Sequence, residues 1–457
     1  MEMGGPACLA GILVWRATAG GLWFGPDARA YHDAARSFAE TGGLWIHDAC
    51  GGLVWLATFP PLFPIVASLW AVFGADLLTW GRVLNCLCAA ASAGMLAAAV
   101  RGVGGSAVTG LLAGLALALQ PDFLNAHRSF LSEPLFYALV FAAVYLLSRG
   151  GGLGAAALFG LAAAVRFAGV LFVAAGAWLE WRTKRSFPAA LAFAAVGAAP
   201  PVIATAANLY FAGRGSDRQF TFDPIGVAYV RQGLSVITGW ARLEWLPLGV
   251  QAGIVLVAAV WLVVRGRKGF AMILAAGYMA LLVATRLWLD AQVELFPRYL
   301  VPVFGLALVA LCEAAVWRAQ LLFALLAAIH ASRSFGPPDL LAAKYNSNHP
   351  AWRQSATLQH AAGLQGIACH YGSRPDLIHL HLGKPAEWIP RRLKGYTKTE
   401  DSSWCAEVRG GKRPAAFLYF DIHEPDENAL VSRDELERCL GAVERIRLAD
   451  GEVLVAR

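Results

Sequence analysis

Long apolar stretches separated by short charged segments set the pattern of this chain. The stretches 111–119 and 250–264 approach, with their flanks, the roughly 20 residues that a helix needs to cross a membrane. Helices are the expected spanning elements, because each helix satisfies its own backbone hydrogen bonds in lipid. The pattern predicts about eleven spanning helices, near residues 6–24, 80–100, 104–120, 133–148, 152–165, 167–181, 188–212, 247–264, 269–287, 299–317 and 319–333.

Basic residues fall in the short segments between these stretches, and loop charge records the orientation of a membrane protein. They are Arg101, Arg149, Arg182, Lys184, Arg185, Arg265, Arg267, Lys268 and Arg318. If all of them face the cytoplasm, the first helix leads outward, residues 25–79 form a long external loop, and the C-terminal segment is also external. The apolar segment 59–73 is then a helix along the membrane interface, because counting it as a span would reverse the later loops.

The character of the chain changes after residue 333, where prolines, histidines and charges appear and apolar runs shrink to strand length. Short buried strands are predicted at 377–382 and 415–420, and a helix at 433–443 with acidic residues in its first turns. The sequence therefore predicts an all-α polytopic membrane bundle over residues 1–333 and a small extracytoplasmic α/β domain over residues 334–457.

Composition supports this assignment. The 457 residues are 58% hydrophobic and 15% charged, with a mean hydropathy of +0.53, whereas soluble domains are about 25% charged. The net charge of +7 lies in loops and not on a basic face interleaved with aromatics, so no nucleic-acid partner is expected. Four cysteines fall in segments placed outside the cytoplasm, where disulfides form, and their pairing stays open: Cys50, Cys369, Cys405 and Cys439.

Two ionisable residues occupy positions that are costly without a partner or a function. Asp27 follows the first span and could act as a general base on an acceptor hydroxyl, or hold a metal or donor; capping a helix is an equal alternative. Arg166 interrupts the segment 152–181, which could form two short helices or one long tilted helix. No acid lies within a helical turn of Arg166, so an anion is expected beside it, unless the side chain snorkels at a helix end.

Further candidates lie in later loops. Glu133 follows a loop that carries an acid, a histidine and a cation, which could hold a phosphosugar; alternatively Glu133 caps its helix while Arg128 pairs with Asp122. Arg298 and Tyr299 open a late span, where interfacial anchoring would look the same. His379 and His381 alternate with leucines on a predicted strand and would share a face; without a third ligand, a structural role is preferred to zinc binding.

These motifs together resemble the GT-C superfamily of glycosyltransferases, most closely bacterial relatives of the protein O-mannosyltransferases and the lipid A aminoarabinose transferases. That family carries an acid after its first helix and then Tyr and Ala-Arg, as Asp27, Tyr31 and Ala35-Arg36 do here. The family then shows a proline-rich interfacial helix that ends in Phe-Gly and is followed by an arginine. Residues 59–74 and Arg82 match this feature. Further matches are Ser132-Glu133-Pro134-Leu135, the cation Arg166, and Arg298-Tyr299-Leu300-Val301-Pro302.

The resemblance implies an inverting glycosyltransferase that takes a sugar from a polyprenyl-phosphate carrier at the extracytoplasmic face of a bacterial inner membrane. It implies that Asp27 is the catalytic base and that Glu133 orients a substrate or ligates a divalent cation, if one is used. The donor phosphate would be bound by Arg166, Arg298 and Tyr299. The other substrate-binding residues expected from the motifs are Tyr31, His32, Arg82, Asp122, His127 and Arg128. No metal ligands are assigned, and the lipid-phosphate sugar is the only cosubstrate implied.

The leading alternative is a transporter or flippase for a lipid-linked or anionic substrate, which would also place charges inside a helical bundle. Transporters usually show repeated halves with paired broken helices near the membrane midplane. The two halves of this sequence show no such correspondence, and its candidate charges gather toward one face. The expected partners are therefore a polyprenyl-phosphate sugar, the lipid bilayer, and an acceptor that is a glycan, a lipid or a protein.

Overall fold

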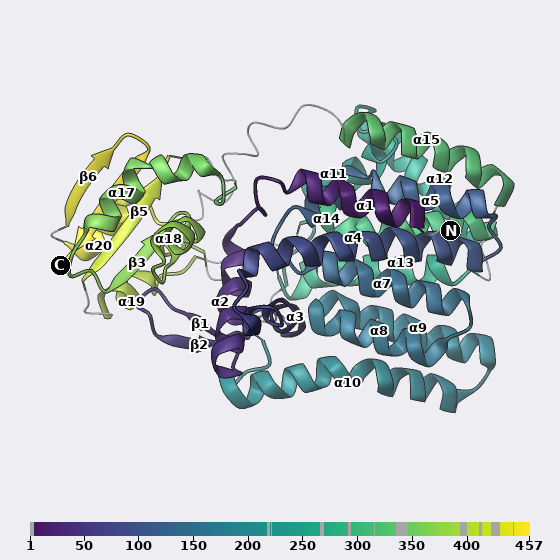
Figure 1. Ribbon diagram of the computed structural model, residues 1–457, viewed down its shortest axis with the longest axis horizontal. Coiled ribbons are helices and arrows are strands. Elements are labelled where there is room, and N and C mark those ends of the chain that lie inside the picture. The colour runs from purple at the N-terminus through teal and green to yellow at the C-terminus, as the bar shows by residue number, and fades with distance from the viewer. Residues whose placement is uncertain are drawn as a thin grey trace.

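A bundle of apolar helices carries a small sheet unit at one end (Figure 1). The computed structural model describes residues 4–216, 220, 222–265, 269–290, 294–314, 316–334, 346–393, 400–410, 414–421, 430–441 and 443–457. The helices of the bundle are α1 (Gly4–Ala17), α4 (Leu77–Gly102), α5 (Ala107–Ala118), α7 (Glu133–Ser148), α8 (Gly152–Val165), α9 (Val170–Lys184), α10 (Phe187–Ala212), α12 (Leu248–Arg265), α13 (Phe270–Trp288), α14 (Pro297–Ala314) and α15 (Val316–Ser334).

Each predicted span corresponds to one of these helices, so the prediction of a helical membrane bundle is confirmed. In the part of the chain that the structure describes, α4, α10, α13 and α14 are long and apolar enough to cross a membrane. Helix α5 and the short α6 (Pro121–His127) form a pair bent by 60° that would add a fifth span. The basic loop residues Arg267 and Lys268 lie outside the described residues.

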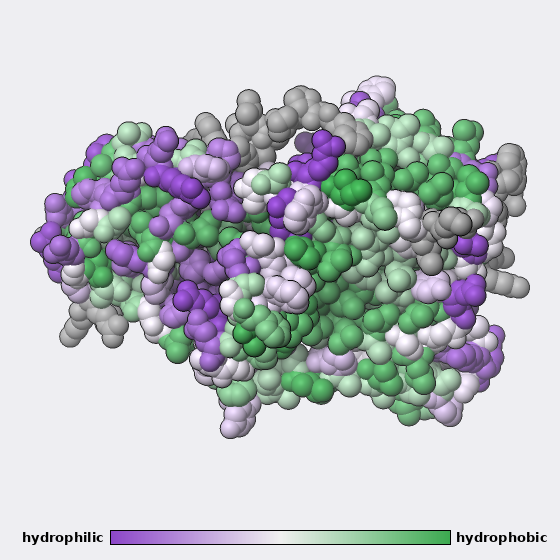
Figure 2. Space-filling view, viewed as in Figure 1, coloured by the Kyte–Doolittle hydropathy of each residue, from purple (hydrophilic) through white to green (hydrophobic). Residues whose placement is uncertain are grey.

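The outer surface of the bundle is apolar. Figure 2 shows hydrophobic residues over most of its visible face, while hydrophilic residues gather on the sheet unit. Large side chains on α10 and α12, such as Ile203 and Leu256, are exposed. Exposed apolar side chains of this size in a helical bundle are what contact with lipid requires, because lipid and not water then covers them.

Glycines let the helices approach one another closely. Gly160 of α8 lies against the backbone carbonyl of Gly197 on α10, and Gly305 of α14 lies against the ring of Phe141 on α7. A side chain at Gly160 or Gly305 would collide with these neighbours. Small residues at helix contacts are typical of membrane bundles, where close van der Waals packing replaces the hydrophobic effect.

The segment 152–181 forms two short helices, one of the two expected alternatives. Helix α8 ends at Val165, Arg166 adopts an extended backbone conformation (φ −147°, ψ 130°), and a single turn, η2 (Phe167–Gly169), precedes α9. Gly169 packs directly on the backbone of α8 at Ala163, where a side chain would not fit. The break therefore places Arg166 at a helix end and not within a continuous helix.

The long loop after α1, which the sequence predicts to be external, contains its own short elements. These are α2 (Pro26–Thr41), the antiparallel pair β1 (Trp45–His47) and β2 (Leu53–Trp55), α3 (Leu62–Ser68) and η1 (Ala71–Phe73). Helix α2 is amphipathic and buries one side, including Tyr31, Ala34 and Ala35. The segment 59–73 forms the short helix α3 and a 3-10 turn, which are too short for an ordinary span.

The C-terminal unit is a five-stranded mixed sheet with helices around it. Its strand order is β4-β3-β5-β7-β6, with β3 parallel to β4 and β5, and β7 antiparallel to β5 and β6. The strands are β3 (Cys369–Gly372), β4 (Glu387–Trp388), β5 (Ala415–Phe420), β6 (Glu444–Leu448) and β7 (Gly451–Ala456). The helices are η3 (Pro350–Gln354), α17 (Ala356–Gly363), α18 (Pro375–Leu382), α19 (Trp404–Gly410) and α20 (Arg433–Leu440). The predicted strand at 415–420 and helix from 433 are confirmed.

The strand predicted at 377–382 is wrong, because these residues form helix α18. Pro375 occupies the first turn, where its missing N–H costs nothing, and Gly383 ends the helix in the left-handed conformation that favours glycine. These boundary signals outweigh the alternation of leucine and histidine. His379 and His381 therefore do not share a face, since residues two apart on a helix point in nearly opposite directions.

The C-terminal unit is tied to the loop that carries α2, β1 and β2. Within the described residues, disulfides join Cys50 to Cys369 and Cys405 to Cys439. The first of these links the β1–β2 turn to β3 across 319 residues of sequence. The backbone N–H groups of Phe24 and Ser347 also bond across this boundary, to Asn346 and to Phe24 respectively. The sheet unit thus lies on the same side of the bundle as the first loop (Figure 1).

Candidate active site

Three distant segments bring one acid and two arginines together at the end of the bundle that carries α2. Glu133 begins α7, Arg166 lies at the break between α8 and α9, and Arg298 lies in the first turn of α14. The Nη1 atom of Arg166 lies 2.9 Å from Oε1 of Glu133, and Nε of Arg298 lies 3.4 Å from the same oxygen. We call these three residues the Glu133 cluster.

Proline helps to place two of these residues. Pro134 and Pro297 each lie in the first turn of their helix, where the fixed φ of proline suits a helix start and the missing N–H needs no partner. Glu133 and Arg298 are therefore held at helix beginnings, at the end of the bundle and not at its middle. Arg166 lies at the same end of the bundle because α8 ends at Val165, one residue before it.

The Glu133 cluster carries an excess of positive charge. Glu133 is 2% exposed and its second carboxylate oxygen has no hydrogen-bond partner among the described residues. The side chains of Arg166 and Arg298 are 22% and 32% exposed, so solvent or a ligand reaches both guanidinium groups. Two cations against one carboxylate leave a net charge of about +1, which favours an anionic ligand.

Ser132 and Tyr31 connect this cluster to α2. The Ser132 hydroxyl oxygen accepts hydrogen bonds from the Tyr31 hydroxyl at 3.0 Å and from Nη1 of Arg166 at 3.1 Å. Burial raises the pKa of Tyr31, so its hydroxyl stays protonated and can donate. Tyr31 thereby fixes the position of α2 relative to Arg166.

Asp27 lies one helical turn before Tyr31, so the two side chains share a face of α2. It is exposed, and its charge acts on both Tyr31 and Arg298. The helix is capped by Gly25 without a side-chain bond, so Asp27 is a first-turn residue and not the N-cap that was the alternative. An exposed carboxylate whose charge reaches one of the two arginines suits a proton acceptor.

Aromatic side chains enclose the two arginines. The ring of Tyr299 lies 5.1 Å from Cζ of Arg166 and 5.2 Å from Cζ of Arg298, and its hydroxyl accepts a 3.4 Å hydrogen bond from Arg298 Nη2. The hydroxyl of buried Tyr137 donates to the backbone carbonyl of Arg298. Tyr137 comes from α7, so it holds the first turn of α14 against the helix that carries Glu133.

The anion expected beside Arg166 is supplied by the protein itself. Glu133, 33 residues earlier in the sequence, fills the place that the local sequence leaves empty. Conversely, Glu133 does not suit a divalent cation, because its neighbours at 2.9 and 3.4 Å are both guanidinium groups.

The structure does not bring Asp122, Arg128 or Arg82 into the Glu133 cluster. Asp122 accepts a 2.6 Å hydrogen bond from Gln120. Arg128 donates to Asn125 at 3.2 Å, and no pair between Arg128 and Asp122 occurs among the described contacts. Arg82 stacks on Trp15 at 3.6 Å and donates to its backbone carbonyl, which anchors α4 to the end of α1.

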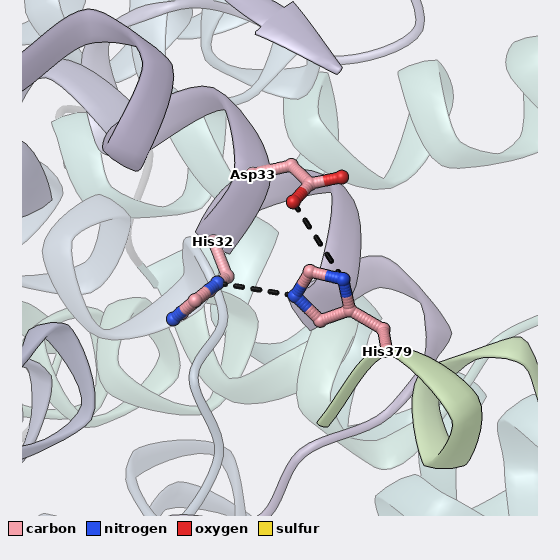
Figure 3. Close-up of side chains that lie close together, drawn as sticks. All are labelled: His32, Asp33 and His379. Atoms are coloured by element: carbon pink, nitrogen blue, oxygen red, sulfur yellow. Dashed lines mark hydrogen bonds and ion pairs between the residues drawn. The ribbon is translucent and has the colours of Figure 1, made fainter. Parts of the chain in front are cut away.

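The two histidines expected to bind substrate, His127 and His32, are not part of the Glu133 cluster. His127 is fully buried, its Nδ1 pairs with the carbonyl of Phe123 at 2.7 Å, and its ring packs 5.8 Å from that of Tyr137. His32 faces the C-terminal unit, where it forms a second group with Asp33 and His379 (Figure 3). Burial lowers the pKa of His32, and lowers that of His379 to about 4, so both rings are neutral at pH 7.

Comparisons with known proteins give one family match and several structures with a similar fold. Residues 20–173, about one third of the chain, match the family of dolichyl-phosphate-mannose-protein mannosyltransferases. Crystal structures of ArnT from Cupriavidus metallidurans, bound to undecaprenyl phosphate and in the apo state, each share 14% identity and superpose with a TM-score of 0.59 over 99% of this chain and 97% of theirs. These structures belong to the GT-C glycosyltransferases. The chain has the GT-C fold.

Another GT-C structure is similar over the whole of this chain. The oligosaccharyltransferase of Archaeoglobus fulgidus, solved in complex with Zn and sulfate, shares 12% identity, with a TM-score of 0.53 over 99% of this chain and 73% of that one. No curated protein sequence matches the chain. The mannosyltransferase match includes Asp27, Glu133 and Arg166, while Arg298 and Tyr299 lie beyond it.

Sequence reasoning missed three residues that shape these sites. Ser132 was noted only as part of a motif, although its hydroxyl joins α2 to Arg166. Tyr137 gave no signal, because a tyrosine one turn into an apolar helix resembles any core residue. Asp33 adjoins His32 on an amphipathic helix, and its 5% exposure was the missing information.

Proposed function

We propose that this protein is a membrane glycosyltransferase that transfers a sugar from a polyprenyl-phosphate donor to an acceptor at the extracytoplasmic face. The observation that carries the proposal is the Glu133 cluster: two partly exposed arginines around one buried carboxylate, with the exposed Asp27 close enough for its charge to act on Arg298. A phosphate group matches the excess positive charge and the donor geometry of guanidinium groups.

The transfer follows from this placement. Asp27 removes the proton from the acceptor hydroxyl or amine, whose lone pair forms a bond to the anomeric carbon of the sugar. The bond from that carbon to the phosphate oxygen breaks, and polyprenyl phosphate leaves. Its phosphate goes from one negative charge to two during this step. Arg166 and Arg298 therefore stabilise the transition state more than the bound donor, which is the requirement for catalysis. Attack from the side opposite the leaving phosphate gives inversion.

Other residues position these groups. The ring of Tyr299 lies beside both arginines, and Tyr31, which bonds Ser132, holds α2 and hence Asp27 in place beside the cluster. Glu133 fixes the two guanidinium groups by its shared oxygen. We assign to it the role of positioning Arg166 and Arg298, since it is buried beneath them and Asp27 is open to an acceptor.

The comparisons and the disulfides support the donor class and the location. ArnT was crystallised with undecaprenyl phosphate, and the matching family is described by a dolichyl-phosphate-linked sugar. The chain is a multi-pass membrane protein, and we propose a bacterial inner membrane with the C-terminal domain of residues 334–457 outside. Disulfides at Cys50–Cys369 and Cys405–Cys439 favour an oxidising compartment for that side.

The test uses purified protein and a panel of radiolabelled polyprenyl-phosphate sugars, with release or transfer of the sugar as the readout. Asp27→Asn and Arg166→Ala are each expected to lower the rate at least about 100-fold, a typical contribution of one general base or one charge-stabilising group. Glu40→Gln and Arg36→Ala, which remove an exposed ion pair on the same α2, are the matched controls.

Two outcomes would overturn the proposal. One is that correctly inserted Asp27→Asn and Arg166→Ala proteins turn over as fast as the controls. The other is that no sugar is released from any donor, while proteoliposomes move the intact donor lipid across the bilayer, which is the result expected of a flippase.

A further inference from the structure

A group of metal-ligating side chains lies outside the Glu133 cluster, where α2 meets the C-terminal unit. We propose that His32, Asp33 and His379 form a binding site for a divalent transition-metal ion, with zinc the best match. His32 and Asp33 are neighbours on α2, and His379 comes from α18, almost 350 residues later in the sequence. Figure 3 shows the two imidazole rings and the carboxylate turned toward one another.

The distances fit a metal site. Nε2 of His379 lies 3.2 Å from Nδ1 of His32, and one potential ligand atom from each of the three residues lies within 4.8 Å of the others. Zinc binds histidine nitrogen at about 2.0–2.1 Å, so two nitrogens on a tetrahedral ion lie roughly 3.3 Å apart. The two imidazoles already have this separation. Two nitrogens and a carboxylate oxygen are a donor set that zinc takes, with water as a fourth ligand.

Packing holds the three side chains in place. The ring of His379 stacks on Phe24 with a 3° angle between the rings and 6.1 Å between their centres. The ring of His32 meets Phe24 edge-on at 5.7 Å and Phe130 at 6.2 Å. Asp33 is 5% exposed, and its second oxygen lies 3.4 Å from the backbone N–H of His47. Supporting contacts of this kind orient metal ligands before an ion arrives.

A direct hydrogen bond between the two imidazoles is the competing explanation. It accounts for the 3.2 Å contact but leaves Asp33 unexplained, because Oδ1 of Asp33 lies 3.6 Å from Nδ1 of His379, beyond an ordinary hydrogen bond. The second oxygen of Asp33 is occupied by His47, whose backbone N–H lies 3.4 Å and whose Nδ1 lies 3.6 Å away, while Oδ1 faces the two imidazoles without an ordinary hydrogen bond to them. A cation that binds Oδ1 and both imidazoles explains this almost buried oxygen better than the imidazole pair does.

The position of the site suggests what the ion does. The opposite side of α2 carries Asp27 and Tyr31, and α18 belongs to the unit that the Cys50–Cys369 disulfide ties to the first loop. A metal ion here joins α2 to α18 by bonds that the unfolded chain lacks. It would fix α2, and through it the rim of the Glu133 cluster, against the C-terminal unit.

The test measures metal content in the full-length protein, purified in detergent without added metal or chelator and then equilibrated with zinc and dialysed. Wild type is expected to keep one zinc per chain, and His379→Gln and Asp33→Asn to fall to background. His381→Gln is the matched control, because His381 lies on the same α18 but pairs with the carbonyl of Ser347 at 2.7 Å. It should keep the full zinc content.

A second measurement separates loss of the site from loss of the fold. Co²⁺ added to the apo protein should give the visible d–d bands of a four-coordinate ion in wild type and His381→Gln, and none in the monodisperse His379→Gln protein. Chelator should lower the thermal midpoint of wild type and zinc restore it, with no effect on His379→Gln. The proposal is overturned if wild type holds no stoichiometric zinc, or if folded His379→Gln binds zinc and Co²⁺ as wild type does.

Discussion

Replacing Glu133 by glutamine is expected to destabilise the protein while tightening its hold on polyprenyl phosphate. The substitution keeps the shape of the side chain and one carbonyl oxygen but removes the charge. In the native protein that charge is buried, 2% exposed, and shared by Arg166 at 2.9 Å and Arg298 at 3.4 Å. The two arginines then lose the carboxylate that they share.

The size of both effects follows from these contacts. Two unit charges about 4 Å apart interact with about 4 kcal/mol at an effective dielectric constant of about 20. Removing one partner of a buried pair costs about 3–5 kcal/mol. Because the two arginines are 22% and 32% exposed, water screens part of this loss, and we expect about 3 kcal/mol of destabilisation. The net charge of the pocket rises from about +1 to about +2, which should tighten polyprenyl-phosphate binding about tenfold, or about 1.4 kcal/mol.

The assay pairs thermal denaturation in detergent with equilibrium binding of undecaprenyl phosphate at low salt, where charge effects are least screened. Glu40→Gln, which removes an acid that is 60% exposed on α2, is the control for loss of one negative charge. Sugar transfer should slow in Glu133→Gln, because the product phosphate is held more tightly. Weaker or unchanged lipid binding together with an unchanged midpoint would refute the charge balance that we assign to this pocket.

Three further outcomes follow from the packing. Cys369→Ser should lower the thermal midpoint, by the equivalent of about 2–4 kcal/mol. Wild type in reducing agent should lose at least as much, because reduction also opens the Cys405–Cys439 disulfide. Burial lowers the pKa of His370 to about 4, so the unfolded chain binds this proton at a higher pH than the folded chain does. The free energy of unfolding should therefore decline by up to about 1.4 kcal/mol per pH unit as the pH falls from 6.5 toward 4. The His370→Gln variant should lack that part of the slope. Gly305→Ala should lower the free energy of unfolding by about 1–3 kcal/mol, because the added methyl group collides with Phe141. Gly249→Ala, where the added methyl group meets open space, should leave it unchanged. Thermal denaturation of both variants measures the difference.

The membrane helices were predictable because the signal for each is local. A run of apolar residues must form a helix in lipid, where backbone groups have no other hydrogen-bond partners. Arg166 stood out as a charge that no neighbour in the sequence neutralises, but the sequence left open whether the helix breaks there, and the structure shows that it does. The helix α18 shows the limit of this approach: the alternation of leucine and histidine suggested a strand, and the boundary residues Pro375 and Gly383 carried the better evidence.

The sequence by itself indicated that this protein lies in a membrane, where its apolar helices fall, and which residues carry a charge that needs a partner. Asp27, Glu133, Arg166 and Arg298 could be named because ionisable groups near lipid are expensive unless they are used. Only the tertiary structure decided which of these side chains contact one another. It joined Arg166 to Glu133 and His32 to His379, because such contacts depend on how helices pack and not on spacing along the chain.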